Sequence, residues 1–147
     1  MIHTLTPPHV GHIATVTRNP HRLAEFYRDL LDLQIVREAS NQIMGDAVLL
    51  SGRPDDEDHE LVFVTKPEAI HTAFRVDSLG ILTAFYDRAR ARGIEVPYAL
   101  DTGVARGFFV RDPDGSAIEI YAALDRQRRE TPPLADPAGI DRLIRGS

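Results

Sequence analysis

Cysteine is absent from this chain of 147 residues, which excludes disulfide bonds and thiolate metal ligands. Its absence fits a reducing compartment, and we expect the protein in the cytoplasm. No apolar run approaches the ~20 residues that span a bilayer. The first residues, MIHTLTPPHVGH, have neither the basic segment nor the apolar core of a signal peptide. We therefore expect no membrane partner.

The chain also has few positively charged residues. It contains 17 Lys and Arg and 22 Asp and Glu, for a formal net charge of −5. With no basic stripe along the chain, we expect no nucleic-acid partner. The content of 43% hydrophobic and 27% charged residues is ordinary for a globular protein of one domain. We expect this domain over residues 1–125, followed by a polar connector and a short helix over 126–147.

An internal repeat is the most informative feature of the sequence. His12 and His71 begin two matching stretches, at an offset of 59 residues. At the same offset Glu60 matches Glu119, so each half has a histidine followed 48 residues later by a glutamate. Other matched pairs are Ala14 with Ala73, Leu23 with Leu82, Phe26 with Phe85, Tyr27 with Tyr86 and Ile35 with Ile94. The repeat predicts two equivalent modules, over about residues 10–66 and 70–124.

Each module is expected to contain a strand, a helix and then three strands. Asn19 followed by Pro20 is typical of a helix start. For the first module we expect strands over 10–17, 33–37, 47–51 and 60–65 and a helix over 19–32. For the second we expect strands over 71–76, 94–97, 107–111 and 117–122 and a helix over 78–92. The buried stripe of the first helix is predicted to consist of Leu23, Phe26, Tyr27, Leu30 and Leu31.

Neither module can bury a sheet by itself, so we predict an α+β fold in which the two βαβββ modules pair. They would form one curved mixed sheet around a metal-binding cavity, into which His12, His71 and Glu119 point. Glu119 lies between Ile118 and Ile120, and a carboxylate buried there needs a compensating partner. Two imidazoles and one carboxylate form the facial triad that binds non-haem Fe(II) and related divalent ions.

Three stretches carry a family resemblance: GHIATVT, HTAFRVDSL and FFVRDPDGSAIEIYA. They resemble the vicinal oxygen chelate superfamily, which includes glyoxalase I, bleomycin-resistance proteins, methylmalonyl-CoA epimerase and type I extradiol dioxygenases. The Asp-Pro-x-Gly-x-x-x-Glu ending is typical of the extradiol branch. The resemblance covers residues 10 to about 124 and implies metal ligands at His12, His71 and Glu119. It also implies a homodimer and one divalent ion, for which we expect Fe(II), with Mn, Zn, Ni or Co as alternatives.

Two adjacent residues of the stretch HELVF favour different chemistry. His59 matches the acid/base histidine of extradiol enzymes, in which three protein ligands leave room for a catechol and O2. The gapless repeat instead brings Glu60 to the place of Glu119, as a fourth ligand or an acid/base group of the glyoxalase and epimerase kind. Neighbours on a strand point to opposite faces, although a bulge would let both reach the site, so the sequence leaves both alternatives open.

Two positions depart from the extradiol pattern. Phe109 stands where the pattern has a tyrosine, so the substrate pocket keeps the ring and loses the hydroxyl, and residues 100–103 contain no histidine. The motifs HELVF and DPDGSAIEIY together predict a metal-dependent extradiol-type dioxygenase that cleaves an aromatic ring beside a vicinal diol. The alternatives are a glyoxalase- or epimerase-like metal-dependent lyase or isomerase, and a metal-free ligand-binding protein similar to bleomycin-resistance proteins.

Overall fold

Two βαβββ modules and a C-terminal helix make up the protein in the computed structural model, which describes residues 5–146. The first module contains β1 (His9–Val16), α1 (Pro20–Leu31), β2 (Gln34–Asn41), β3 (Gly45–Ser51) and β4 (Leu61–Val64). After the short helix η1 (Pro67–Ala69), the second contains β5 (His71–Val76), α2 (Leu79–Ala91), β6 (Tyr98–Asp101), β7 (Ala105–Arg111) and β8 (Ala117–Ala123). Helix α3 (Pro137–Arg145) follows. The α+β class and the repeated order of elements are confirmed.

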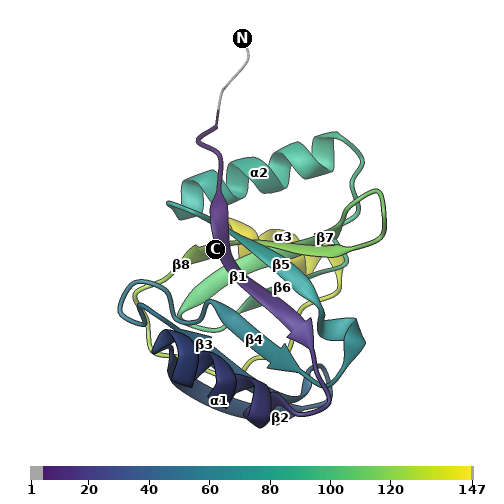
Figure 1. Ribbon diagram of the computed structural model, residues 1–147. Helices are drawn as coiled ribbons and strands as arrows, with labels where there is room; N and C mark the ends of the chain where they lie inside the picture. Colours follow the sequence, from purple (N-terminus) through teal and green to yellow (C-terminus); the bar gives the residue numbers. More distant parts are fainter. Residues whose placement is uncertain (1–4, 147) are drawn as a thin grey trace. The chain divides into compact units, whose positions relative to one another are not determined.

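The chain divides into two compact units: residues 11–72, the N-terminal unit, and residues 73–146 with the segment before Gly11, the C-terminal unit. The strand order is β2-β3-β4-β1 in one module and β6-β7-β8-β5 in the other (Figure 1). In both modules, therefore, the first strand lies beside the last. β1 runs parallel to β4, whereas β2–β3, β3–β4, β6–β7 and β7–β8 are antiparallel, so the pairing is mixed as predicted.

Helix α1 covers one face of the N-terminal sheet. Its start is fixed by Asn19, whose side-chain oxygen accepts a hydrogen bond from the Arg22 N–H at 3.1 Å, and by Pro20 in the first turn. Its end is Asp32, which adopts the left-handed conformation with φ of 58°. Ala24 is fully buried in a cluster with Val48, Leu50 and Phe63, and Leu23 and Tyr27 pack against the same cluster.

The predicted buried stripe of α1 is only partly present. Leu23 and Tyr27 contact the sheet, but Phe26, Leu30 and Leu31 are 57%, 65% and 55% exposed. A helix turns about 100° per residue, so Phe26 lies a quarter-turn away from Tyr27 and off the covered face. The prediction was wrong because it assigned every apolar residue of the helix to one face.

Helices α2 and α3 cover one face of the C-terminal sheet and form its core with the strands. Leu82, Tyr86, Phe108, Ile140 and Ile144 are all fully buried there, with Ile118 and Ile120 packed against them. Since side chains alternate along a strand, Phe109 and Glu119 lie on the opposite face. They are directly opposite each other in the β7–β8 ladder. No helix of residues 5–146 is long and apolar enough to cross a membrane.

A buried ion pair anchors the segment that follows β8. The side chains of Asp101 and Arg106 are only 3% and 7% exposed, with Arg106 Nε 3.1 Å from Asp101 Oδ2. Asp101 also accepts from Arg129, and its carbonyl oxygen accepts from the Thr131 hydroxyl. Helix α3 is thus part of the core of the C-terminal unit, while the expected domain boundary near residue 125 stays a prediction.

The prediction of a strand over residues 94–97 was wrong. These residues are irregular, and β6 begins at Tyr98. Pro97 has no N–H to donate to a ladder, which is consistent with a strand that begins just after it. The ladder then runs from Tyr98 opposite Phe109 to Asp101 opposite Arg106. The later start of β6 brings Tyr98 into the sheet, a residue that the sequence analysis does not single out.

Candidate metal centre

Two histidines of the N-terminal unit face each other through their ring nitrogens. His12 lies on β1 and is 6% exposed, and His71 is the first residue of β5. Their Nε2 atoms are 3.1 Å apart. His71 Nδ1–H donates to the Ala69 carbonyl of η1 at 2.8 Å, which leaves the lone pair of a neutral His71 on Nε2. The short helix before β5 therefore fixes the tautomer that a metal ligand needs.

The distance between these two nitrogens fits a shared divalent ion. Two ligand atoms about 2.1 Å from one ion and at right angles about it lie about 3.0 Å apart. The observed 3.1 Å is close to this value. The same pair can also form an N–H···N hydrogen bond in which His12 Nε2 donates to His71, so the distance is compatible with metal binding and does not require it.

Glu119 of the C-terminal unit supplies the carboxylate. It lies in the middle of β8 and is 8% exposed, although it is a charged residue. A buried carboxylate is unfavourable unless hydrogen bonds or a cation compensate it. His12, His71 and Glu119 are the described residues that could together hold a metal ion, each with one ligand atom. Two imidazoles and a carboxylate suit Fe(II), Mn(II) and similar ions.

His59 lies against His12 in the N-terminal unit. The two ring centroids are 4.2 Å apart, with 48° between the ring planes. His59 Nδ1 is 2.7 Å from Asp58 Oδ2, and Asp58 also accepts two hydrogen bonds from Arg37, at 3.1 and 2.7 Å. The hydrogen bond from His59 and the Arg37 guanidinium hold the pKa of Asp58 well below its ordinary value. Asp58 is thus an acceptor, and a neutral His59 carries its proton on Nδ1 and its lone pair on Nε2.

Glu60 has a different environment, although it follows His59 directly. One of its oxygens accepts from the Gly52 N–H at 2.8 Å and from the Ser51 hydroxyl at 3.4 Å. The other pairs with Arg53 Nε at 3.1 Å. Glu60 lies in a bend just before β4, so strict strand alternation does not apply to it. Both oxygens therefore bind the loop after β3.

Asp58 and Arg37 are the site residues that the sequence did not reveal. Asp58 belongs to the acidic turn DDED, which reads as solvated surface. Arg37 follows an irregularity in the β2–β3 ladder between Ile35 and Arg37. The only available signal was the adjacency of Asp58 to a candidate catalytic histidine, which is weak by itself.

Phe109, the predicted pocket residue, is on the Glu119 face of the C-terminal sheet. It is 7% exposed, and its ring centroid is 4.6 Å from that of Tyr98, with 31° between the planes. Burial raises the pKa of the Tyr98 hydroxyl, and the negative charge of Glu119 raises it further against the opposing effect of Arg111. The phenol therefore remains protonated at neutral pH.

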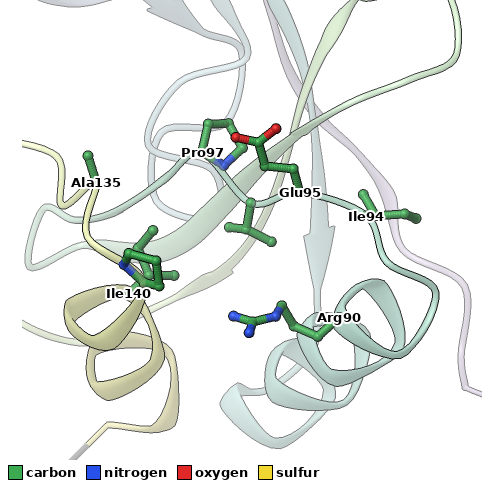
Figure 2. A pocket seen from close by; sticks show the side chains of 8 residues that line it. Arg90, Ile94, Glu95, Pro97, Ala135 and Ile140 are labelled. Atoms are coloured by element: carbon green, nitrogen blue, oxygen red, sulfur yellow. The ribbon is translucent and has the colours of Figure 1, made fainter.

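A separate cavity of about 230 Å³ lies in the C-terminal unit between the end of α2, residues 94–97 and α3. Figure 2 labels six of its lining residues: Arg90, Ile94, Glu95, Pro97, Ala135 and Ile140. None of the predicted site residues lines it. We therefore assign it no part in the chemistry of the site.

Comparisons with known proteins place the chain among metal-dependent and related enzymes of one family. The chain is 26% identical over 124 residues to biphenyl-2,3-diol 1,2-dioxygenase 2 of Rhodococcus globerulus, which covers 77% of this chain and 62% of the relative. The chain thus spans less than two thirds of that relative.

Solved structures show the same fold at lower identity. The Mn(II)-bound glyoxalase from Novosphingobium aromaticivorans has a TM-score of 0.65 and 19% identity, over 88% of this chain and 43% of that one. Methylmalonyl-CoA epimerase from Mycobacterium tuberculosis has a TM-score of 0.62 and 23% identity, over 84% of this chain and 93% of that one. Residues 9–120 match the family model of these proteins. The chain belongs to the Glyoxalase/Bleomycin resistance protein/Dioxygenase superfamily.

Proposed function

We propose that the protein is an extradiol-type dioxygenase that binds one divalent metal ion, Fe(II) in the first place, through His12, His71 and Glu119. Its substrate would be an aromatic vicinal diol, which it would cleave beside the two hydroxyls with incorporation of O2. The observation that carries the proposal is the placement of His59, whose ring lies 4.2 Å from that of a candidate metal ligand and whose Nδ1–H is held by Asp58.

The assignment of roles follows from the hydrogen bonds. A divalent ion bound by the three residues would act as a Lewis acid on the diol oxygens and so favour loss of their protons. His59, whose ring lies against that of His12, would accept a proton from a diol hydroxyl and then return it as the ring opens. Asp58 keeps the His59 ring in one tautomer and stabilises it when it is protonated, and Arg37 holds Asp58 in place. The similarity to biphenyl-2,3-diol 1,2-dioxygenase 2 of Rhodococcus globerulus supports biphenyl-2,3-diol or a related aromatic diol as substrate.

An epimerase- or glyoxalase-like isomerase or lyase is the second candidate. One observation favours it: the chain covers 93% of the epimerase structure but only 62% of the dioxygenase relative. Against this candidate stands Glu60, the fourth ligand that it would use, because both Glu60 oxygens bind the loop after β3.

The decisive experiment measures metal content by mass spectrometry on protein purified without oxygen. The matched variants are His12→Ala and His21→Ala, the latter at an exposed histidine that pairs with Glu38 on the surface. We expect about one iron per chain in the wild type and His21→Ala, none in His12→Ala, and O2 uptake when biphenyl-2,3-diol or catechol is added.

The other outcomes separate the alternatives. One Mn, Zn, Ni or Co per chain without O2 uptake would favour the isomerase or lyase. No metal in any of the three proteins, with ligand binding that chelators leave unchanged, would favour the metal-free binding protein. The same proposal includes a homodimer, for which light scattering on the purified protein should give twice the mass of the chain.

A further inference from the structure

Three side chains form a row across the C-terminal sheet. In the β6–β7 ladder Tyr98 lies directly opposite Phe109, and in the β7–β8 ladder Phe109 lies directly opposite Glu119. Residues that are directly opposite in antiparallel strands project to the same face. Phe108 projects the other way, into the core with Tyr86 of α2. The phenol of Tyr98 therefore shares a face with the carboxylate of Glu119, two strands away.

The ring of Tyr98 is held in place by its neighbour. Its centroid is 4.6 Å from that of Phe109, and the two ring planes are tilted by 31° to each other, so the rings are in contact. Phe109 is buried and Tyr98 half-buried, so Tyr98 is the more accessible residue of the pair. Neither residue is at a chain end or in a loop, since both lie within strand ladders.

The hydroxyl of Tyr98 is available to a ligand. Within residues 5–146, no protein group forms a hydrogen bond with it. The hydroxyl of Tyr86, by contrast, accepts from Arg90 at 3.1 Å and lies 3.5 Å from Asp141. Burial and the Glu119 charge raise the pKa of Tyr98, so at neutral pH its hydroxyl is a hydrogen-bond donor.

We infer that Tyr98 is a substrate-binding residue whose hydroxyl donates a hydrogen bond to an oxygen of the aromatic diol at the Glu119 face. This inference rests on the proposed function and deepens it. Phe109 offers an aromatic surface without a donor, and Tyr98, beside it in the ladder, supplies the donor. The pair would favour a flat substrate that carries oxygen at the ring edge, which is the chemistry of a catechol.

The test is anaerobic binding of 4-nitrocatechol, whose visible absorption changes when it is bound and ionised, to Mn(II)-loaded protein. Tyr98→Phe keeps the ring contact and removes only the hydroxyl. We expect it to retain its metal and to weaken 4-nitrocatechol binding about 10- to 100-fold, the range for a hydrogen bond that involves a charged group. Tyr86→Phe, which removes the same hydroxyl on the opposite side of the sheet, should bind 4-nitrocatechol like the wild type.

A second variant tests position as well as chemistry. The double variant Tyr98→Phe/Phe109→Tyr moves the hydroxyl from β6 to β7 along the same row, closer to Glu119. We expect this variant to regain most of the 4-nitrocatechol affinity that Tyr98→Phe loses. Equal affinity of Tyr98→Phe and the wild type would overturn the role of Tyr98 and leave the diol-binding proposal standing. Equal losses in Tyr98→Phe and Tyr86→Phe would also overturn it. No binding of 4-nitrocatechol to the metal-loaded wild type would overturn both this inference and the proposed function.

Discussion

His59 and Glu60 are adjacent residues with opposite surroundings, and this difference gives the first prediction. His59→Gln should leave the metal content unchanged and lower turnover of biphenyl-2,3-diol about 10²- to 10⁴-fold, because the variant loses the group that moves the proton. Turnover is followed by O2 uptake, and metal by mass spectrometry. Unchanged turnover would remove His59 from the mechanism.

Glu60→Gln distinguishes the two kinds of site. Since both Glu60 oxygens bind Gly52, Ser51 and Arg53, we expect the variant to keep its metal affinity. Its main effect should be a looser loop after β3, visible as faster amide hydrogen exchange there. A large loss of metal affinity, measured by titration against a chelator, would instead support a four-ligand site of the glyoxalase or epimerase kind.

At the residue scale, what the sequence could predict depended on the repeat. His12, His71 and Glu119 were singled out because two of them match at a fixed offset and the third has a counterpart, and they are the described residues that could hold a metal. The choice between His59 and Glu60 depends on the bend before β4. This bend brings the His59 ring against His12 and turns the Glu60 carboxylate toward the loop after β3. A bend of one residue has no periodic signal in a sequence.

At the scale of elements, the ion pair of Asp101 and Arg106 connects β6 and β7 to the C-terminal segment. Asp101→Ala should lower the free energy of unfolding by about 3–5 kcal/mol, because it leaves the Arg106 charge buried without its partner. The measurement is urea denaturation at pH 7. Asp87→Ala, which removes an exposed partner of Arg145, is the matched control and should cost much less.

The pH dependence of this difference is a further check on the same pair. Burial alone would raise the pKa of Asp101, but hydrogen bonds from the Gly103 N–H and from Arg106 outweigh it and hold the pKa below its ordinary value. The contribution of Asp101 is therefore complete above about pH 4 and is lost as the pH falls through the lowered pKa. A gap between wild type and Asp101→Ala that widens on acidification would contradict this assignment.

The elements show why periodicity was only partly sufficient. The order of helices and strands follows from apolar patterns and caps such as Asn19 and Ser78, each of which accepts a hydrogen bond from a backbone N–H of the first helical turn. The face that a helix buries depends on what packs against it, and α1 is covered along Leu23, Ala24 and Tyr27, whereas Phe26 is exposed. The start of β6 follows Pro97, which has no N–H to donate to the ladder with β7, and the strand predicted over residues 94–97 did not allow for this.

At the scale of the whole molecule, binding of a divalent ion by His12, His71 and Glu119 gives a prediction for thermal stability. A ligand that binds only the folded chain stabilises it by mass action, by about 2.7 kcal/mol at a concentration of 100 times its Kd. For a chain of this size that corresponds to a rise in Tm of about 5–10 °C. We therefore expect the thermal transition of the protein to shift to a higher temperature when the ion binds.

Calorimetry of the apo protein with increasing Mn(II) or, without oxygen, Fe(II) measures this shift. His12→Ala should abolish it and His21→Ala should retain it, since His21 lies on the surface beside Glu38. An equal shift in His12→Ala would mean that the ion binds elsewhere in the protein. His59 would then not lie beside the bound ion, and its proposed role as acid/base would be contradicted.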